Sequence, residues 1–113
     1  FYLSQKKLTE AIASYNFIQK QYPTSSIVNE SILREAFIQL KINKISKSSE
    51  LAEKLTNTKL APMGLLLLGE LYEKYEKDIA KALNYYYKLL EEHPDFYLSE
   101  PVRLHVRILN EQL

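Results

Sequence analysis

The feature that most constrains this chain is an internal repetition. Four positions near its start recur with the same character, each shifted by 71 positions (82 − 11 = 71). The pairs are Ala11 and Ala82, Tyr15 and Tyr86, Ile18 and Leu89, and Pro23 and Pro94. Units made of two helices repeat with a period of about 34 residues. The shift therefore indicates two such periods with a few extra residues between them.

Residues 63–94 show what one unit contains. Apolar side chains recur at three- and four-residue steps in two consecutive segments, which is the spacing of a buried helix face. The first segment carries Leu65, Leu68, Leu71, Tyr72 and Tyr75, and the second carries Ile79, Ala82, Leu83, Tyr86, Leu89 and Leu90. Lys77-Asp78 offers a polar turn with an N-cap, and His93-Pro94 ends the second segment. We predict two antiparallel helices that cross closely at Gly69 and Ala82.

A helix pair with small facing residues, large aromatic neighbours and a closing proline resembles the tetratricopeptide repeat. The resemblance implies an all-α fold, a right-handed α-solenoid of antiparallel helix pairs with a C-terminal capping helix. It divides the chain into a truncated first repeat at residues 1–23, a degenerate second repeat at 24–60, a third at 61–94 and the capping helix at 95–113. The Tyr22-Pro23 ending is similar to repeats in bacterial cell-envelope proteins of the Tol–Pal coordinator and outer-membrane assembly lipoprotein type. That resemblance alone favours the periplasm over the cytoplasm.

The second repeat departs most from this pattern. Its first helix is expected to bury Leu33, Ala36, Phe37 and Leu40, which lie 35 positions before Leu68, Leu71, Tyr72 and Tyr75. Its second helix uses Ser48, Ala52 and Leu55, which lie 34 positions before Ala82, Tyr86 and Leu89. In this alignment Arg34 replaces Gly69. Ala52 replaces a tyrosine, which leaves a void unless Phe37 or a neighbouring tyrosine fills it.

Both ends of the chain are expected to be helical. Residues 1–3 are interpreted as the end of a first helix, followed by a turn at Lys6-Lys7 and a second helix up to Tyr22. Thr24-Ser25-Ser26 supplies N-cap candidates for the next helix, and Ser99 is the expected N-cap of the last. The apolar stripe of the last helix is Leu98, Val102, Val106, Leu109 and Leu113. We expect five substantial helices and a remnant at the N-terminus.

The composition argues against several classes of function. Lysine and arginine number 15 against 14 acidic residues, so no global field attracts nucleic acid. No apolar run approaches the roughly 18 residues of a membrane span, so this chain is not expected to insert into a membrane. There is no cysteine and no catalytic or phosphate-binding motif, and His93 and His105 have structural interpretations. We expect no enzyme, no metal site and no cofactor.

The tetratricopeptide resemblance implies a protein–protein interaction module that binds a peptide or protein segment in a concave groove. In such repeats the first helix of each pair lines the concave side. The candidate groove residues are Val28, Ser31, Glu35, Gln39, Met63, Leu66, Glu70, Glu73 and Lys74. A groove with an apolar end and an acidic end suits a segment with a hydrophobic anchor and a basic flank. Alternatively, Met63 and Leu66 pack beneath a neighbouring repeat.

The alternative function is a structural, self-associating segment of a larger tetratricopeptide protein. The chain starts at Phe1 rather than methionine, so we expect it to be a piece of a longer protein. Leu104 and Ile108 form a second apolar strip on the last helix and are candidates for contacts in a homo-oligomer. Residues 1–60 carry a net charge of +4 (9 − 5) and residues 61–113 a net charge of −3 (6 − 9). This difference has two interpretations, which are two solvated faces of opposite charge bias or head-to-tail contacts between copies.

Overall fold

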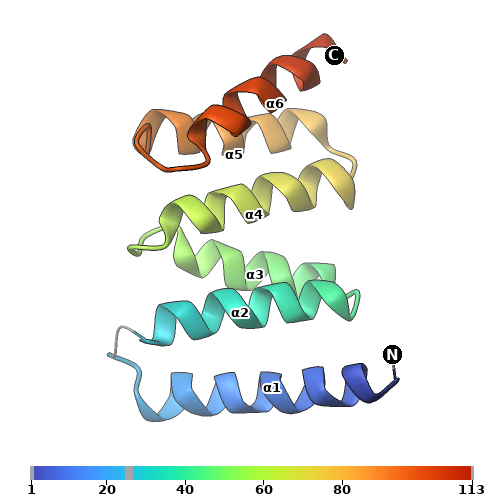
Figure 1. Ribbon diagram of the computed structural model, residues 1–113, viewed down its shortest axis with the longest axis vertical. Helices are drawn as coiled ribbons and strands as arrows, with labels where there is room; N and C mark the ends of the chain where they lie inside the picture. The colour runs from blue at the N-terminus through green and yellow to red at the C-terminus, as the bar shows by residue number, and fades with distance from the viewer. Residues whose placement is uncertain (1, 25–26, 113) are drawn as a thin grey trace.

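Six α-helices make up residues 2–24 and 27–112, the part of the chain described by this computed structural model (Figure 1). They are α1 (Tyr2–Gln21), α2 (Ile27–Lys41), α3 (Ile45–Leu55), α4 (Ala61–Lys74), α5 (Ile79–Glu92) and α6 (Ser99–Glu111). The described residues contain no strand, which confirms the predicted all-α class. Among residues interpreted above, Phe1, Ser25, Ser26 and Leu113 lie outside the described ranges.

The helices stack in chain order, each antiparallel to the one before it (Figure 1). Each helix packs against its neighbour in the sequence, and the described molecule measures 43 × 32 × 19 Å. Packing between consecutive elements is the organisation of a solenoid, in which each unit contacts mainly its neighbours. The predicted helical-repeat architecture is therefore confirmed.

The first helix differs from the prediction. α1 runs without a break from Tyr2 to Gln21, so the predicted turn at Lys6-Lys7 is wrong and the N-terminal remnant belongs to the same helix. Lysine is a good helix former, and no glycine or proline lies nearby to end the helix. Both lysine side chains are exposed on α1. A pair of polar residues is thus too weak a signal to place a turn.

One turn connects α2 to α3 and another connects α4 to α5, and the two turns have similar geometry. Asn43 and Lys77 adopt left-handed backbone conformations, with φ of 65° and 57°. Such a residue ends a helix because the chain leaves the helical path there. Asp78 then caps α5 as predicted, its carboxylate accepting a hydrogen bond of 3.1 Å from the N–H of Lys81. Three residues separate α2 from α3 and four separate α4 from α5, so the later turn is one residue longer.

Ser99 does not cap α6 as predicted. It lies inside the helix and is buried, and its hydroxyl donates a hydrogen bond of 2.9 Å to the carbonyl of His93. The residue at the N-cap is Leu98, which offers no side-chain acceptor. Ser99 therefore ties the start of α6 to the end of α5 instead of capping its own helix.

Backbone hydrogen bonds fix how the second and third repeats align. In the turn after α2, the N–H of Lys44 donates a hydrogen bond of 2.8 Å to the carbonyl of Gln39. In the turn after α4, the N–H of Asp78 donates a hydrogen bond of 2.8 Å to the carbonyl of Tyr72. These carbonyls lie 33 positions apart (72 − 39 = 33), and the same shift brings the small, buried Ala36 onto Gly69. The predicted shift of 35 between the first helices is therefore wrong by two, and Arg34 does not replace Gly69.

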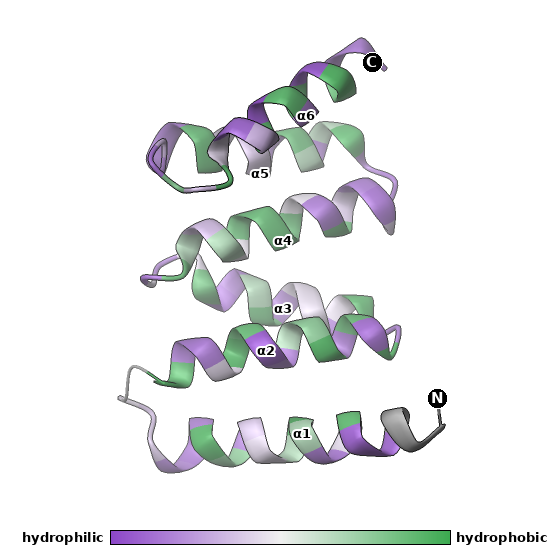
Figure 2. Cartoon of the chain, viewed as in Figure 1, coloured by the Kyte–Doolittle hydropathy of each residue, from purple (hydrophilic) through white to green (hydrophobic). Residues whose placement is uncertain are grey.

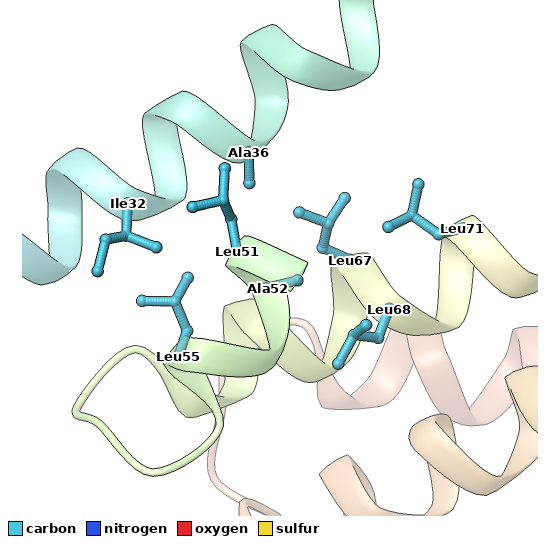
Figure 3. Close-up of a cluster of buried hydrophobic side chains, with 8 residues drawn as sticks. All are labelled: Ile32, Ala36, Leu51, Ala52, Leu55, Leu67, Leu68 and Leu71. Atoms are coloured by element: carbon cyan, nitrogen blue, oxygen red, sulfur yellow. The ribbon is translucent and has the colours of Figure 1, made fainter. Parts of the chain in front are cut away.

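A cluster of buried aliphatic side chains joins α2, α3 and α4 (Figure 3). Its buried members are Ile32, Ala36, Leu51, Ala52, Leu55, Leu67, Leu68 and Leu71. Phe37 is exposed, so its predicted burial is wrong, but of the neighbouring tyrosines Tyr72 and Tyr85 pack against the cluster. The backbones of α3 and α4 also approach closely, since a Cβ added to Gly64 would lie 2.9 Å from the carbonyl oxygen of Ala52. The hydrophobic residues of α4 lie mostly in its first half, and its C-terminal end is hydrophilic (Figure 2).

A second cluster joins α5 and α6 and centres on Tyr86. Its buried members are Ala82, Leu83, Tyr86, Val102, Val106 and Leu109. The Tyr86 ring lies directly against Gly69, because a Cβ added there would meet a ring carbon at 2.4 Å. In the second repeat the corresponding pair is Ala36 and Ala52, both buried. The sizes of the two facing residues are thus matched to each other within a repeat. Glycine faces tyrosine in the third repeat, and two alanines take the same positions in the second.

Ala11 and Ala82 occupy corresponding positions in the sequence repeat, but they are not equally buried. Ala82 is fully buried, whereas Ala11 is only half-buried. The difference arises because α5 packs between α4 and α6, while the main helix contact of α1 within the described residues is with α2. The face of α1 that corresponds to the packed face of α5 therefore remains partly exposed.

Replacing Gly69 with alanine should destabilise the protein by about 1–3 kcal/mol, because the new methyl group overlaps the Tyr86 ring. Tyr86→Ala should cost about 3–5 kcal/mol through the cavity that it leaves. Combining them recreates the Ala36 and Ala52 pair, so the double variant should cost less than the sum of the single variants. Urea titrations followed by circular dichroism measure all three. Strict additivity would contradict the proposed contact.

Candidate functional site

A pocket opens between α4 and α6 over the ring of Tyr86. Its volume is about 280 Å³, and it is lined by Leu66, Glu70, Lys74, Tyr86, Leu98, Pro101, Val102 and His105. Three of these residues come from α4 at four-residue steps, which places them on one helix face. Leu66, Glu70 and Lys74 were predicted as groove residues, and the pocket brings them together.

A polar cluster joins the three helices around this pocket. Oε1 of Glu73 accepts a hydrogen bond of 2.8 Å from the Tyr86 hydroxyl and lies 2.7 Å from Nε2 of His105. The rings of Tyr86 and His105 also meet edge to face, with centroids 5.7 Å apart. Through Glu73, α4 is bonded to both α5 and α6. This fixes the position of the α6 wall of the pocket.

The environment shifts the pKa values of this cluster. Burial by itself would raise the pKa of Glu73, but the hydrogen bonds from His105 and Tyr86 outweigh it and hold that pKa below its ordinary value. Burial, followed by the hydrogen bond to Glu73, strongly raises the pKa of Tyr86. At neutral pH, Glu73 is therefore an ionised acceptor and Tyr86 a neutral donor.

Three of the four predicted groove residues on α2 are buried rather than exposed. Ser31, Glu35 and Gln39 are buried, with Glu35 only 1% exposed. Gln19 of α1 donates a hydrogen bond of 3.0 Å to Oε1 of Glu35, and Gln39 donates one of 3.3 Å to Oε2. The covering helix is α1, so these polar residues form a seam between α1 and α2. The prediction failed because it took polar residues as solvent-facing.

The buried faces of α2 and α6 establish a second correspondence. Ser31 and Glu35 of α2 are buried on the side of α1, while Val102 and Val106 of α6 are buried against α5. These two pairs lie 71 positions apart (102 − 31 = 71), the same shift that relates α1 to α5. Helix α6 therefore takes the place of a first helix, like α2 and α4.

The same shift identifies residues on the open side of these helices. It relates Leu33 and Phe37 of α2 to Leu104 and Ile108 of α6. Phe37 is 39% exposed, Leu104 59% and Ile108 53%. Because Pro101 lines the pocket and Leu104 and Ile108 follow it at helical spacing, all three lie on one face of α6. The residues proposed for self-association therefore continue the pocket surface.

The remaining predicted groove residues have mixed positions. Val28 is partly buried and packs against the cluster of α2, α3 and α4. Met63 is half-buried and does not line the pocket. Leu66 lines the pocket and also packs against the α5–α6 cluster, so the groove and the packing interpretations both apply to it.

Sequence reasoning missed the contribution of α6 to this site. His105 and Glu73 are 32 positions apart, so no local pattern connects them. Leu98 was assigned to the apolar stripe of the last helix, although it lines the pocket together with Pro101. The usable signal was the 71-residue shift. Applied to α2 and α6, it would have assigned Leu104 and Ile108 to the positions equivalent to Leu33 and Phe37.

Neither a metal-binding cluster nor a membrane-spanning helix is found among the described residues. Within residues 2–24 and 27–112, no group of three or more histidine, cysteine, aspartate or glutamate side chains could hold a metal ion. Among the described helices, none is both long enough and apolar enough to cross a membrane.

Comparison with known proteins identifies one repeat. Residues 64–95 match the family model of the tetratricopeptide repeat. The match covers α5 and most of α4, the pair around which the pocket is built. No curated protein and no solved structure gives a significant match. Together with the helical stacking, the matched repeat supports the tetratricopeptide family and a helical-repeat scaffold. The narrower resemblance to cell-envelope proteins stays a prediction.

The lowered pKa of Glu73 predicts how stability depends on pH. A carboxyl group with a lowered pKa in the folded state contributes stability above its unfolded pKa and loses it as the pH falls through the folded value. Wild-type protein should therefore lose its stability advantage over Glu73→Gln as the pH falls below about 4.5. Tyr86→Phe, which removes one donor, should reduce the effect. Urea titrations across this range measure it, and a constant difference would contradict it.

Proposed function

We propose that this chain is a protein-interaction module that binds a segment of another protein along the open face of α2, α4 and α6. Tetratricopeptide repeats are non-catalytic interaction motifs, and residues 64–95 match their model. The proposal concerns where binding takes place on this chain. It replaces the predicted α2 stripe with Leu33 and Phe37, and it joins Leu104 and Ile108 to the groove.

The observation that carries the proposal is the exposure of large apolar side chains on corresponding positions of two helices. Phe37 on α2 and Ile108 on α6 occupy equivalent positions and are both exposed, as is Leu104. Scattered apolar residues are normal on a protein surface, whereas a recurrent set on one face is typical of a binding surface. The pocket between α4 and α6 adds depth to this face. An amphipathic helix or extended segment suits such a surface.

Introducing a charged side chain on this apolar surface should weaken partner binding. The variants Phe37→Glu and Leu104→Glu place a carboxylate on the proposed surface, and Phe17→Lys changes a residue on α1 that is 58% exposed. We expect affinity to fall by at least about tenfold in the first two variants, since each loses a buried apolar contact worth about 1.5–3 kcal/mol. Phe17→Lys should bind as wild type does.

The measurement is quantitative affinity capture of partners from the source cells, followed by calorimetry with the purified partner. Circular dichroism checks that each variant is folded. Equal binding by wild type and both groove variants would overturn the proposed surface. Loss of binding in Phe17→Lys alone would move the interaction to α1.

Self-association is the second candidate function, because Leu104 and Ile108 are exposed on the terminal helix. One residue of α6 argues against a second copy that packs on α6 as the next helix of the solenoid. The shift of 71 that relates α2 to α6 brings Ala36 onto Arg107 (107 − 36 = 71). A small residue at this position lets the next helix approach closely, whereas arginine holds it away.

Light scattering over a range of concentrations tests this second candidate. If α6 takes part in contacts between copies, wild type should associate as its concentration rises and Leu104→Lys should associate less. A monomer at every accessible concentration would exclude self-association and leave the binding of a different protein.

A further inference from the structure

The pocket between α4 and α6 has walls and floor of different chemistry. Leu66, Leu98, Pro101 and Val102 supply aliphatic walls. Glu70 also lines the pocket, and the neighbouring Glu73, which is not a lining residue, is bonded to the pocket residues Tyr86 and His105. The site therefore combines an apolar channel with carboxylates from one helix. This combination suits a side chain with an aliphatic stem and a charged end.

The two carboxylates keep acceptor capacity for a ligand. Both hydrogen bonds to Glu73 end on Oε1, and Oε2 accepts none from the described residues. The pKa of Glu73 lies below its ordinary value, so this oxygen carries charge at neutral pH. Glu70 makes no ion pair within the described part of the chain, and its charge contributes to the raised pKa of Tyr86, behind burial and Glu73.

The positive groups around the pocket do not reverse this balance. Lys74 is exposed and lies one helical turn beyond Glu70, so its ammonium group can remain in water. The N-terminal turn of α6 also faces the pocket, and a helix N-terminus attracts anions. Here, however, Pro101 has no N–H to donate, and Glu100 is the acidic residue of that turn. An anion would find few donors and two carboxylates.

We propose that this pocket receives the side chain of an arginine or lysine from the bound segment. The aliphatic stem lies along Leu66 and Pro101, and the cationic end meets Glu70 and the unoccupied oxygen of Glu73. The inference rests on the proposed function, because it names the chemistry of the partner at that surface. The partner is therefore a basic segment that also carries apolar residues for Phe37 and Leu104.

Three blocked amino acids test the chemistry of the pocket without the partner. The probes are the N-acetyl methylamides of arginine, norleucine and glutamate, which share a backbone and differ in the charge of the side chain. In titrations followed by ¹H–¹⁵N spectra, the arginine probe should shift the resonances of Leu66, Glu70 and His105. It should bind about fivefold more tightly than norleucine, the ratio expected for a partly exposed ion pair. The glutamate probe should bind most weakly.

Two charge-matched variants sharpen this test. Glu70→Gln should weaken arginine binding by about fivefold and leave norleucine binding unchanged. Glu91→Gln makes the same change in net charge at an exposed residue of α5 outside the pocket and should have no effect. Added salt should weaken the arginine probe alone, because screening acts on the charged contact.

Several outcomes would overturn the proposal. These are equal or tighter binding of norleucine or glutamate, arginine-induced shifts on another surface, no arginine binding up to the solubility of the probe, or an equal effect of the two variants. The proposed function fails separately. Partner binding that survives Phe37→Glu and Leu104→Glu contradicts the surface, whereas partner binding that needs those residues but not Glu70 contradicts only the cationic pocket.

Discussion

Close approach of helix backbones at residues with small side chains is the constraint on which this fold depends. Gly64 lets α4 rest on the backbone of α3, and Gly69 receives the ring of Tyr86. These two glycines lie on one helix and face opposite neighbours, so α4 is held closely on both sides. The position of Tyr86 then decides where its hydroxyl meets Glu73, and Glu73 in turn holds His105 of α6. The pocket therefore exists because a glycine allows a tyrosine to lie between two helices.

Sequence reasoning succeeded where small and aromatic residues recur together. The second helices were aligned correctly because Ser48, Ala52 and Leu55 are buried at the same positions as Ala82, Tyr86 and Leu89. It failed for α2, whose Glu35 and Gln39 correspond to Leu68 and Tyr72 after the shift of 33. A search for apolar periodicity cannot recognise a buried carboxylate or amide, so it moved the alignment by two residues to recover an apolar stripe.

The candidate site could be predicted only in part, for a related reason. The stripe predicted on α4 includes Leu66, Glu70 and Lys74, which line one pocket, because a helical face can be deduced from spacing alone. The contribution of α6 depends on how two helices more than 30 positions apart are placed relative to each other. That placement follows from the packing of Val102 and Val106 on α5. It can be predicted once α6 is recognised as equivalent to the first helices α2 and α4.

The polar seam between α1 and α2 has a consequence for a partly unfolded molecule. If α1 frays from the stack, the surface uncovered on α2 carries a hydroxyl, a carboxylate and an amide from Ser31, Glu35 and Gln39. The corresponding surface of α4 would instead expose Leu68 and Tyr72. Water can satisfy the first set at little cost, and the amide oxygen of Gln39 has no hydrogen-bond partner even when covered. Unfolding of α1 alone therefore uncovers a polar surface on α2 that water can hydrate.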